Sequence, residues 1–359
     1  MRKTTELQFG RLLELQSKLN CNWTHIFAAA AASIAKLQQL DRLLLPESGR
    51  PVVEDATVVF FGSLARGECT SQSDTDWVVL VDGQVDEQHF RTYQNTRKAL
   101  IEAGEIQPGS SGVFGGLALS HDIVHRIGGE DDTNRNLTLR MLLLLESVSV
   151  GDDLVRQRVI RAILRRYLAD DPSWTFTSDG KIPRFLLNDS VRFWRTMAVD
   201  FADKFHDQTG EKWALRNAKL RFSRKVIFLT SILACFSWEA RRISFDPKVT
   251  EQTPEMAQFH LLNYLSRPPL EVIADELLTG NVDETTCIKI MNSYDEFLSI
   301  LDDDRLRDEL IILPRDLAEK SELFQRVREL SHSFRDGLAE WLFNTESEIF
   351  KLVKAYALF

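Results

Sequence analysis

The pattern of apolar and polar positions predicts three strands in the first half of the chain. Residues 56–61 and 77–81 are unbroken runs of β-branched and aromatic side chains, a pattern typical of strands that are buried on both faces. Residues 117–127 form a third run, bounded by glycines, that we also expect to be a strand. Together the three runs predict a small sheet.

Helical spacing, with leucines three and four residues apart, fills most of the remaining chain. Residues 6–45 predict two helices that end at the proline-containing segment 45–51, and residues 86–103 predict a helix after the second strand. Beyond the third strand, helical patterns recur at residues 135–150, 154–168, 183–205, 211–238 and 321–358. No strand is expected there.

We therefore expect an α+β fold, with a small mixed-sheet core and a helical lobe. The 359 residues exceed the roughly 250 to 300 at which a single core stops growing, so two lobes are favoured. The predicted division places N-terminal helices that pack on the core at residues 1–50, the core at 51–150 and an all-helical C-terminal domain at 151–359.

Composition limits the class of protein. A net charge of −9 argues against binding nucleic acid by charge alone, and the chain has no recognisable nucleic-acid-binding module. The four cysteines are too far apart for a zinc site or a disulfide framework, which favours reduced thiols. The N-terminus lacks a secretory signal, and the most apolar helical run, residues 226–238, is shorter than the ~20 residues that cross a bilayer. We expect a cytoplasmic protein with no membrane contact.

A glycine and a serine follow the first predicted strand directly. Gly62 has no Cβ and lets the backbone approach a ligand closely, and Ser63 stands where a short helix would begin. Free backbone N–H groups and a hydroxyl at such a turn suit a phosphate. Arg66, in the same turn, either contacts the phosphates or pairs with Glu68, and the sequence does not separate the two.

Two carboxylates lead into the second predicted strand. Asp74 and Asp76 are two residues apart, so an extended chain places both on one face. Such a pair is unfavourable unless a cation neutralises it, and Mg²⁺ held by carboxylates and nucleotide phosphates is a common arrangement. The turn and the carboxylate pair therefore predict a shared site for a nucleoside triphosphate and its metal.

The order of these features, with Gly67 between turn and carboxylates, resembles the signature of DNA polymerase β-like nucleotidyltransferases. The resemblance covers residues 56–150 by motif. It implies transfer of a nucleoside monophosphate from a nucleoside triphosphate, with ATP expected, to a hydroxyl, with release of pyrophosphate. It also implies two Mg²⁺ ions, with Mn²⁺ as the alternative, that bridge the attacking and leaving oxygens.

The same resemblance implies a third carboxylate on a later strand, which helps hold the metal and takes the proton of the attacking hydroxyl. Asp122 is the candidate, because a lone aspartate in an apolar strand is costly to bury unpaired. An ion pair with Arg126 and a solvated position are the alternatives.

Basic residues gather in residues 181–225, where eleven Lys or Arg stand against five Asp or Glu. The resemblance implies that a helical lobe supplies cations to the triphosphate. The candidates are the basic residues that fall on two helix faces, Arg192, Arg195, Arg216 and Lys219. Ion pairs with acids on the same helices are the alternative.

The Gly-Glu pair at residues 67–68, the Ser-Asp-x-Asp motif at 73–76 and the helical lobe look similar to bacterial protein uridylyl- and adenylyltransferase-like domains. A protein acceptor is therefore favoured over RNA or a small molecule, although the sequence does not identify it. The helices before the first strand are similar to those of bacterial cyclic-oligonucleotide synthases, the alternative enzyme. An inactive nucleotide-binding regulatory module is the alternative of another class.

Overall fold

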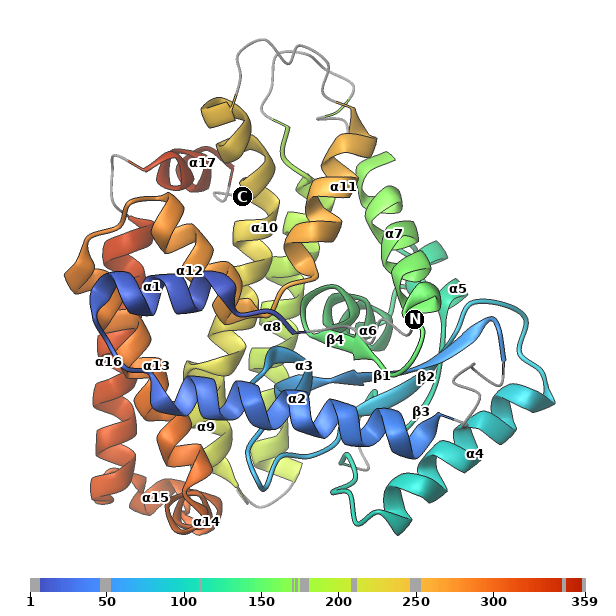
Figure 1. Cartoon of the computed structure of the whole chain (residues 1–359), viewed down its shortest axis with the longest axis horizontal. Helices are drawn as coiled ribbons and strands as arrows, with labels where there is room; N and C mark the ends of the chain where they lie inside the picture. The colour runs from blue at the N-terminus through green and yellow to red at the C-terminus, as the bar shows by residue number, and fades with distance from the viewer. Residues whose placement is uncertain are drawn as a thin grey trace.

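The computed structural model describes residues 7–45, 53–109, 112–169, 171, 174, 181–207, 212–245, 253–343 and 347–356. Figure 1 shows a small sheet at one side of the molecule, next to a larger body of helices. The fold class is α+β, as predicted. Of the segment 45–51, which was predicted to end the second helix, residues 46–51 lie outside the described residues.

The sheet has four strands in the order β3-β2-β1-β4. β1 pairs antiparallel with β2 and with β4, whereas β2 and β3 are parallel, so the sheet is mixed. The strands are β1 (Ala56–Phe61), β2 (Trp77–Val81), β3 (Gly116–Leu119) and β4 (Ser147–Ser149).

Helices surround the sheet and continue beyond it. Those in the first part of the chain are α1 (Gly10–Leu19), α2 (Thr24–Leu44), α3 (Gly62–Arg66), α4 (Glu87–Glu102), α5 (Ser120–His125) and α6 (Asn134–Leu145). The helical body consists of α7 (Leu154–Ala169), α8 (Arg184–Asp207), α9 (Trp213–Arg221), α10 (Ser223–Phe245), α11 (Pro254–Leu265), α12 (Pro269–Thr279), α13 (Glu284–Asp302), α14 (Asp304–Ile312), α15 (Arg315–Ala318), α16 (Glu322–Leu342) and α17 (Glu348–Tyr356). Within the body, α10 contacts α8, α9, α11, α12 and α17, and it is therefore the central helix.

Both faces of the sheet are covered, which explains why its two main strands are unbroken apolar runs. On one face, Val59 and Phe61 of β1 belong to the large core that is shared with the helical body. On the other face, Phe60 of β1 and Val79 of β2 pack in a second core with side chains of α2 and α4.

Three details of the predicted secondary structure are wrong. The strand expected at 117–127 ends at Leu119, and α5 follows, because its buried Ile123 and Val124 pack on α6 and α7. A short apolar run does not distinguish a strand from a buried helix by itself. Strand β4 lies where the end of a helix was expected, and the helix expected at 211–238 divides at the buried Phe222.

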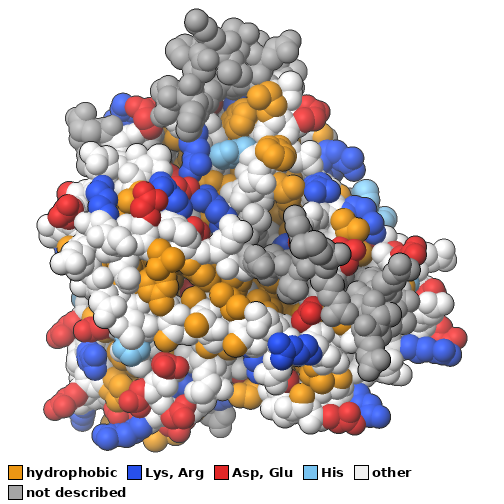
Figure 2. Space-filling model, viewed as in Figure 1, with side chains coloured by type: hydrophobic (Ala, Val, Ile, Leu, Met, Phe, Trp, Pro, Cys, Tyr) orange, Lys and Arg blue, Asp and Glu red, His pale blue; other side chains and the backbone are white. Residues whose placement is uncertain are grey.

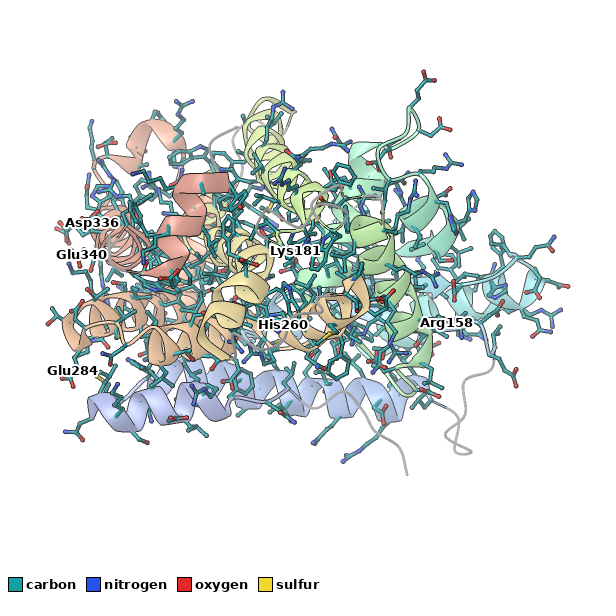
Figure 3. The ribbon with its side chains drawn as sticks, turned by 90° about the horizontal axis from the view of Figure 1, so that it is seen from above. Arg158, Lys181, His260, Glu284, Asp336 and Glu340 are labelled. Carbon is teal, nitrogen blue, oxygen red and sulfur yellow. The ribbon has the colours of Figure 1, made fainter. Side chains whose placement is uncertain are left out.

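The two N-terminal helices lie against both parts of the molecule. α2 contacts α3 and α4 beside the sheet and α13 of the helical body, and α1 packs on α12. Figure 3 shows this N-terminal segment along one side of the whole molecule. Figure 2 shows apolar side chains gathered on the same face, in keeping with the exposed alanines of α2, Ala28, Ala31, Ala32 and Ala35.

The first turns of both N-terminal helices are capped by carboxylates from the C-terminal half of the chain. Their own N-cap residues, Phe9 and Trp23, have no side-chain acceptor. Glu271 of α12 instead accepts the backbone N–H groups at positions 11 and 12, at 2.8 and 2.9 Å, and Asp295 of α13 accepts that of Ile26 at 2.9 Å. These long-range caps satisfy N–H groups that a helix cannot satisfy internally.

No helix in the described part of the chain is both long enough and apolar enough to cross a lipid bilayer.

Replacing Glu271 with alanine is expected to lower the free energy of unfolding by about 2 to 3 kcal/mol, because two buried N–H groups lose their acceptor at once. Glu271 is 4% exposed, so water does not replace it without rearrangement. Urea denaturation of Glu271→Ala beside Glu329→Ala, an exposed position of α16, provides the measurement. Equal midpoints for the two variants would contradict the capping role.

Candidate active site

The predicted phosphate turn lies at the end of β1. Gly62 begins α3 with a φ of +70°, and Gly67 ends it with a φ of +74°. A Cβ on Gly62 would lie 3.0 Å from Oδ2 of Asp76, so this position needs glycine for its conformation and for the space beside the carboxylate. Ser63 is the second residue of the short helix.

The carboxylate pair lies beside this turn. The backbone N–H of Phe61 donates to the carbonyl oxygen of Asp76 at 3.0 Å, which joins the end of β1 to the residue before β2. Burial and, next in size, the charge of Asp74 raise the pKa of Asp76 to about 6, while Arg224 and Lys219 oppose the shift. The two carboxylates are thus close enough to repel each other, as the sequence predicted.

A cleft lies between the sheet and the helical body. Its sheet side is lined by Gly62, Ser63, Arg66, Glu68, Thr70, Ser73, Asp74 and Asp76. Its helical side is lined by Lys219, Ser223 and Arg224 from the junction of α9 and α10, Leu298 and Leu301 of α13, and Arg307 of α14. The cleft therefore places two carboxylates opposite three cationic side chains.

Lys219 is the member of the basic group that the structure places in the cleft. It makes no hydrogen bond or ion pair with the described residues. Burial, with the charges of Arg307, Arg224 and Arg66, lowers the pKa of Lys219 to about 8, although Asp74 opposes the shift. A buried ammonium among other cations is a ready partner for an anion.

Arg66 forms the centre of a buried network below the turn. Its Nε donates to Glu68 at 2.9 Å and its Nη1 contacts Glu146, while the hydroxyl of Tyr294 donates to Glu68 at 2.8 Å. Arg224 lies 3.6 Å from the other oxygen of Glu146. Of the two alternatives for Arg66, the structure shows the ion pair with Glu68, and Tyr294 joins Glu68 to α13.

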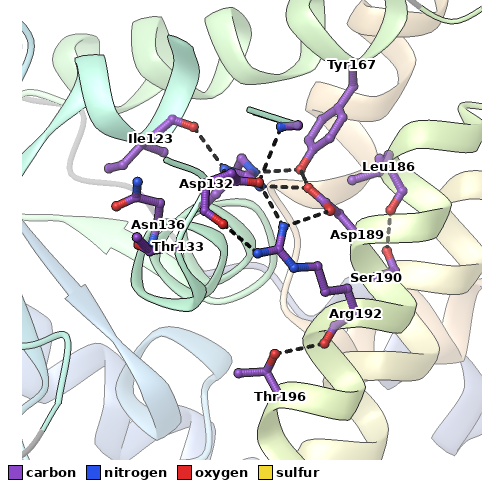
Figure 4. A network of polar contacts seen from close by, with 12 residues as sticks. Ile123, Asp132, Thr133, Asn136, Tyr167, Leu186, Asp189, Ser190, Arg192 and Thr196 are labelled. Atoms are coloured by element: carbon purple, nitrogen blue, oxygen red, sulfur yellow. Dashed lines mark hydrogen bonds and ion pairs between the residues drawn. The ribbon is translucent and has the colours of Figure 1, made fainter. Parts of the chain in front are cut away.

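Arg192, Arg195 and Arg216 do not line the cleft. Arg192 donates to the carboxylate of Asp132 at 2.9 Å and to its carbonyl oxygen at 2.6 Å. Figure 4 shows this contact in a network with Asp189 and Tyr167 that joins α6, α7 and α8 through the fully buried Arg140. Arg195 is exposed on α8. Arg192 therefore pairs with a nearby acid, which was the alternative to a phosphate contact.

Asp122 lies on α5 rather than on a strand, and it does not line the cleft. Its carboxylate pairs with Arg126 at 2.9 Å, one of the alternatives that the sequence left open. Phe114, two residues before β3, has its ring 5.3 Å from that of Phe61 at the end of β1.

Sequence reasoning missed three charged residues of this region, Glu146, Arg224 and Arg307. Glu146 follows α6 directly, is 2% exposed, and raises the pKa of Asp76 by its charge. Its signal is a lone acid at the end of the leucine run 142–145. Arg307 has no comparable signal, because its place in the cleft depends on contacts across more than two hundred residues.

The donors present fit a metal only in part. Among the residues that the structure describes, no group of three or more His, Cys, Asp or Glu side chains has a metal-binding arrangement. Asp74 and Asp76 alone suit Mg²⁺, which commonly takes one or two carboxylates and completes its shell with phosphate oxygens and water. The nucleotide would have to complete such a site.

Comparison with protein families bears on this site directly. Residues 46–109 match the family model described as a nucleotidyltransferase domain. This segment is therefore similar to nucleotidyltransferase domains. The match includes the glycine turn and both carboxylates, and it is consistent with the polymerase β-like superfamily. No curated protein matches the chain significantly.

The carboxylate pair of this segment predicts a pH-dependent stability change. Because the folded-state pKa of Asp76 is raised, its ionised form costs stability above pH about 6, and this cost is absent below pH 3.8. Asp76→Asn is therefore expected to stabilise the metal-free protein at pH 8 by roughly 1 to 2 kcal/mol. Thermal unfolding at pH 8 and pH 4 measures the difference. A stabilisation of equal size at both values would contradict the charge repulsion.

Gly62→Ala is expected to lower nucleotide transfer at least about tenfold, because its Cβ would displace the carboxylate of Asp76. The matched control is Gly104→Ala, which has a φ of +74° but nothing within 4 Å of the added Cβ. Both variants should lose roughly 1 to 2 kcal/mol of stability from the left-handed backbone. Only Gly62→Ala should lose activity, and equal activities in an assay of pyrophosphate release would refute the steric argument.

Proposed function

We propose that the protein transfers a nucleoside monophosphate from a nucleoside triphosphate to a hydroxyl acceptor in a metal-dependent reaction. The observation that carries the proposal is the meeting of Asp74 and Asp76 with Lys219 and Arg307 in one cleft beside the Gly62 turn. This chemistry needs carboxylates that hold a metal, cations that bind phosphates and a glycine turn that lets the backbone approach the phosphates closely.

In the proposed reaction, an oxygen of the acceptor hydroxyl bonds to the α-phosphorus, and the bond from that phosphorus to the bridging oxygen of the β-phosphate breaks. Pyrophosphate leaves with that electron pair, and the hydroxyl proton is released to solvent. Lys219 and Arg307 hold the negative phosphate tail, and Ser63 and the free N–H groups of α3 orient the phosphates.

Asp74 and Asp76 would hold Mg²⁺, two ions being expected and Mn²⁺ the alternative. The metal, when bound, neutralises the carboxylate pair and the charge that develops on the phosphate oxygens. The cleft encloses about 60 Å³ in this structure, whereas ordinary ligand pockets have roughly 300 to 1,000 Å³. It therefore accommodates phosphate groups, and the nucleoside would extend beyond it.

A protein acceptor, ATP as the donor and a cytoplasmic location are further parts of the proposal. They rest on the motif resemblance and on the sequence. The four cysteines are free, which is compatible with a reducing compartment.

A cyclic-oligonucleotide synthase is the second candidate, and one observation favours it. α2 contacts the nucleotidyltransferase core at α3 and α4 and the helical body at α13, as a helix that holds two lobes together would. In that case the accepting hydroxyl would belong to a second nucleotide.

Incubation with Mg²⁺, each α-³²P-labelled nucleoside triphosphate and cell lysate is expected to place label on a protein, with ATP the best donor. Asp74→Asn and Asp76→Asn should each reduce incorporation at least about 100-fold, because the metal loses a ligand. Asp122→Asn, outside the cleft, should stay within about twofold of the wild type. The readout is label per band after electrophoresis.

The same experiment separates the candidates. Label in a small phosphatase-resistant product without lysate would indicate a cyclic oligonucleotide. Nucleotide binding without incorporation or pyrophosphate release under any condition would leave only an inactive regulatory module. Full activity of both Asp74→Asn and Asp76→Asn would refute the metal site.

A further inference from the structure

The carboxylate loop, residues 68–76, is held by helices that follow it by more than two hundred residues. Tyr294 of α13 donates to Glu68 at the start of the loop. Asp304, at the start of α14, accepts hydrogen bonds from the side chains of Ser71 at 3.0 Å and Gln72 at 2.8 Å. The C-terminal helices therefore position the segment that carries Asp74.

Arg307 of α14 makes the most direct of these contacts. Its Nη2 donates to the carbonyl oxygen of Gln72 at 2.6 Å, and its Nη1 donates to the hydroxyl of Thr70 at 3.2 Å. The side chain is 5% exposed and also lines the cleft. One guanidinium thus contacts both the loop and the space proposed for the phosphates.

The third nitrogen of the same guanidinium has no partner. Nε of Arg307 is buried and makes no hydrogen bond among the described residues. A buried N–H without an acceptor is costly, and more so on a charged group. A phosphate oxygen in the cleft is an acceptor of the right charge, and a planar guanidinium can donate to it while keeping its other bonds.

The other end of the loop is fixed by the sheet side of the molecule. Thr75 donates its backbone N–H to the carbonyl oxygen of Ile106 at 2.8 Å and its hydroxyl to Glu105 at 2.7 Å. Asp74, together with Ser73, therefore lies between Thr75 and the segment that Arg307 and Asp304 hold. A small movement of α14 would change the position of Asp74 relative to Asp76.

We propose that Arg307 is a positioning residue that couples phosphate binding in the cleft to the placement of Asp74. The inference rests on the proposed nucleotide site and adds a role for the C-terminal helix α14. An anion bound to Arg307 holds the guanidinium in place, and the guanidinium holds Gln72 and Thr70. Phosphate occupancy therefore orders the carboxylate loop before any metal is bound.

Neighbouring residues provide matched controls. Lys219 lines the same cleft but makes no bond to the loop within the described structure, so Lys219→Met should weaken phosphate binding and leave the free loop unchanged. Asp304 holds the loop but does not line the cleft, so Asp304→Asn should loosen the loop and leave its response to phosphate intact. Arg307→Lys keeps the charge and loses the planar fork.

The test is amide hydrogen exchange of residues 70–76 in metal-free protein with EDTA, with and without saturating pyrophosphate, for the full chain and the three variants. Pyrophosphate should slow exchange in this segment at least fivefold in the wild type and in Asp304→Asn. It should do so in Lys219→Met only at roughly tenfold higher concentration. Arg307→Lys should exchange faster than the wild type and show less than twofold protection at saturation.

Steady-state kinetics give an independent readout of the same coupling. In Arg307→Lys, kcat should fall at least tenfold while KM for the nucleotide changes less than threefold. Wild-type protection of the loop in Arg307→Lys, or a response to pyrophosphate identical to that of Asp304→Asn, would overturn the inference. Arg307→Gln, which has a planar polar head but is shorter and uncharged, replaces Arg307→Lys if the latter does not retain the wild-type circular dichroism spectrum.

The outcomes for this inference and for the proposed function are separable. Protection by pyrophosphate that depends on Arg307, without transfer from any nucleotide, would remove the enzymatic function and keep the coupling. If the wild type is active and pyrophosphate protects the loop equally in the wild type and in Arg307→Lys, the proposed function stands and the coupling is refuted.

Discussion

The repulsion between Asp74 and Asp76 is the constraint on which this structure depends. Burial of Asp76 and, next in size, the charge of Asp74 raise the pKa of Asp76 to about 6, so the more buried carboxylate of the pair is the one that protonates more readily. The two carboxylates stay close because backbone contacts on both sides hold them, from Phe61 to Asp76 and from Ile106 to Thr75. The surrounding cations reduce the cost without removing it. A site of this kind is stable enough to fold and still gains from a bound cation.

The nucleotidyltransferase segment, residues 46–109, does not form this environment alone. The cations of the cleft come from α9, α10 and α14, and the buried Arg66 reaches Glu146 and, through Glu68, Tyr294 of α13. A buried ion pair is weak evidence for stability, but removing one partner leaves a costly unpaired charge. The charged groups below the turn are therefore paired only when the helical body packs against the sheet as it does here. The helical body completes the site.

The sequence predicted what is encoded locally. The strands at 56–61 and 77–81, the Gly62 turn and the pairing of Asp74 with Asp76 follow from runs and spacings within about twenty-five residues. Arg307 could not be predicted, because a single charged residue on a helix is not distinguished from a solvated one until its distant partners are known. Glu146 has a local signal, as a lone acid after the leucine run 142–145. Asp122 failed as a strand residue because the apolar run around it fits a short helix equally. Arg192 was predicted from its place on a basic helix face, but its side chain pairs with Asp132 and does not line the cleft.

The caps on α1 and α2 affect the order in which the chain can fold during synthesis. The acceptor for the N–H at position 11 is 260 residues further along the chain. At about 5 to 20 residues per second, ribosomes need roughly 13 to 50 seconds to reach it. An isolated helix as short as α1 is marginal in water, so its first turn stays uncapped until Glu271 has been synthesised. The helices α1 and α2 should therefore dock only after α12 and α13 are present, when all residues of the sheet have already been synthesised.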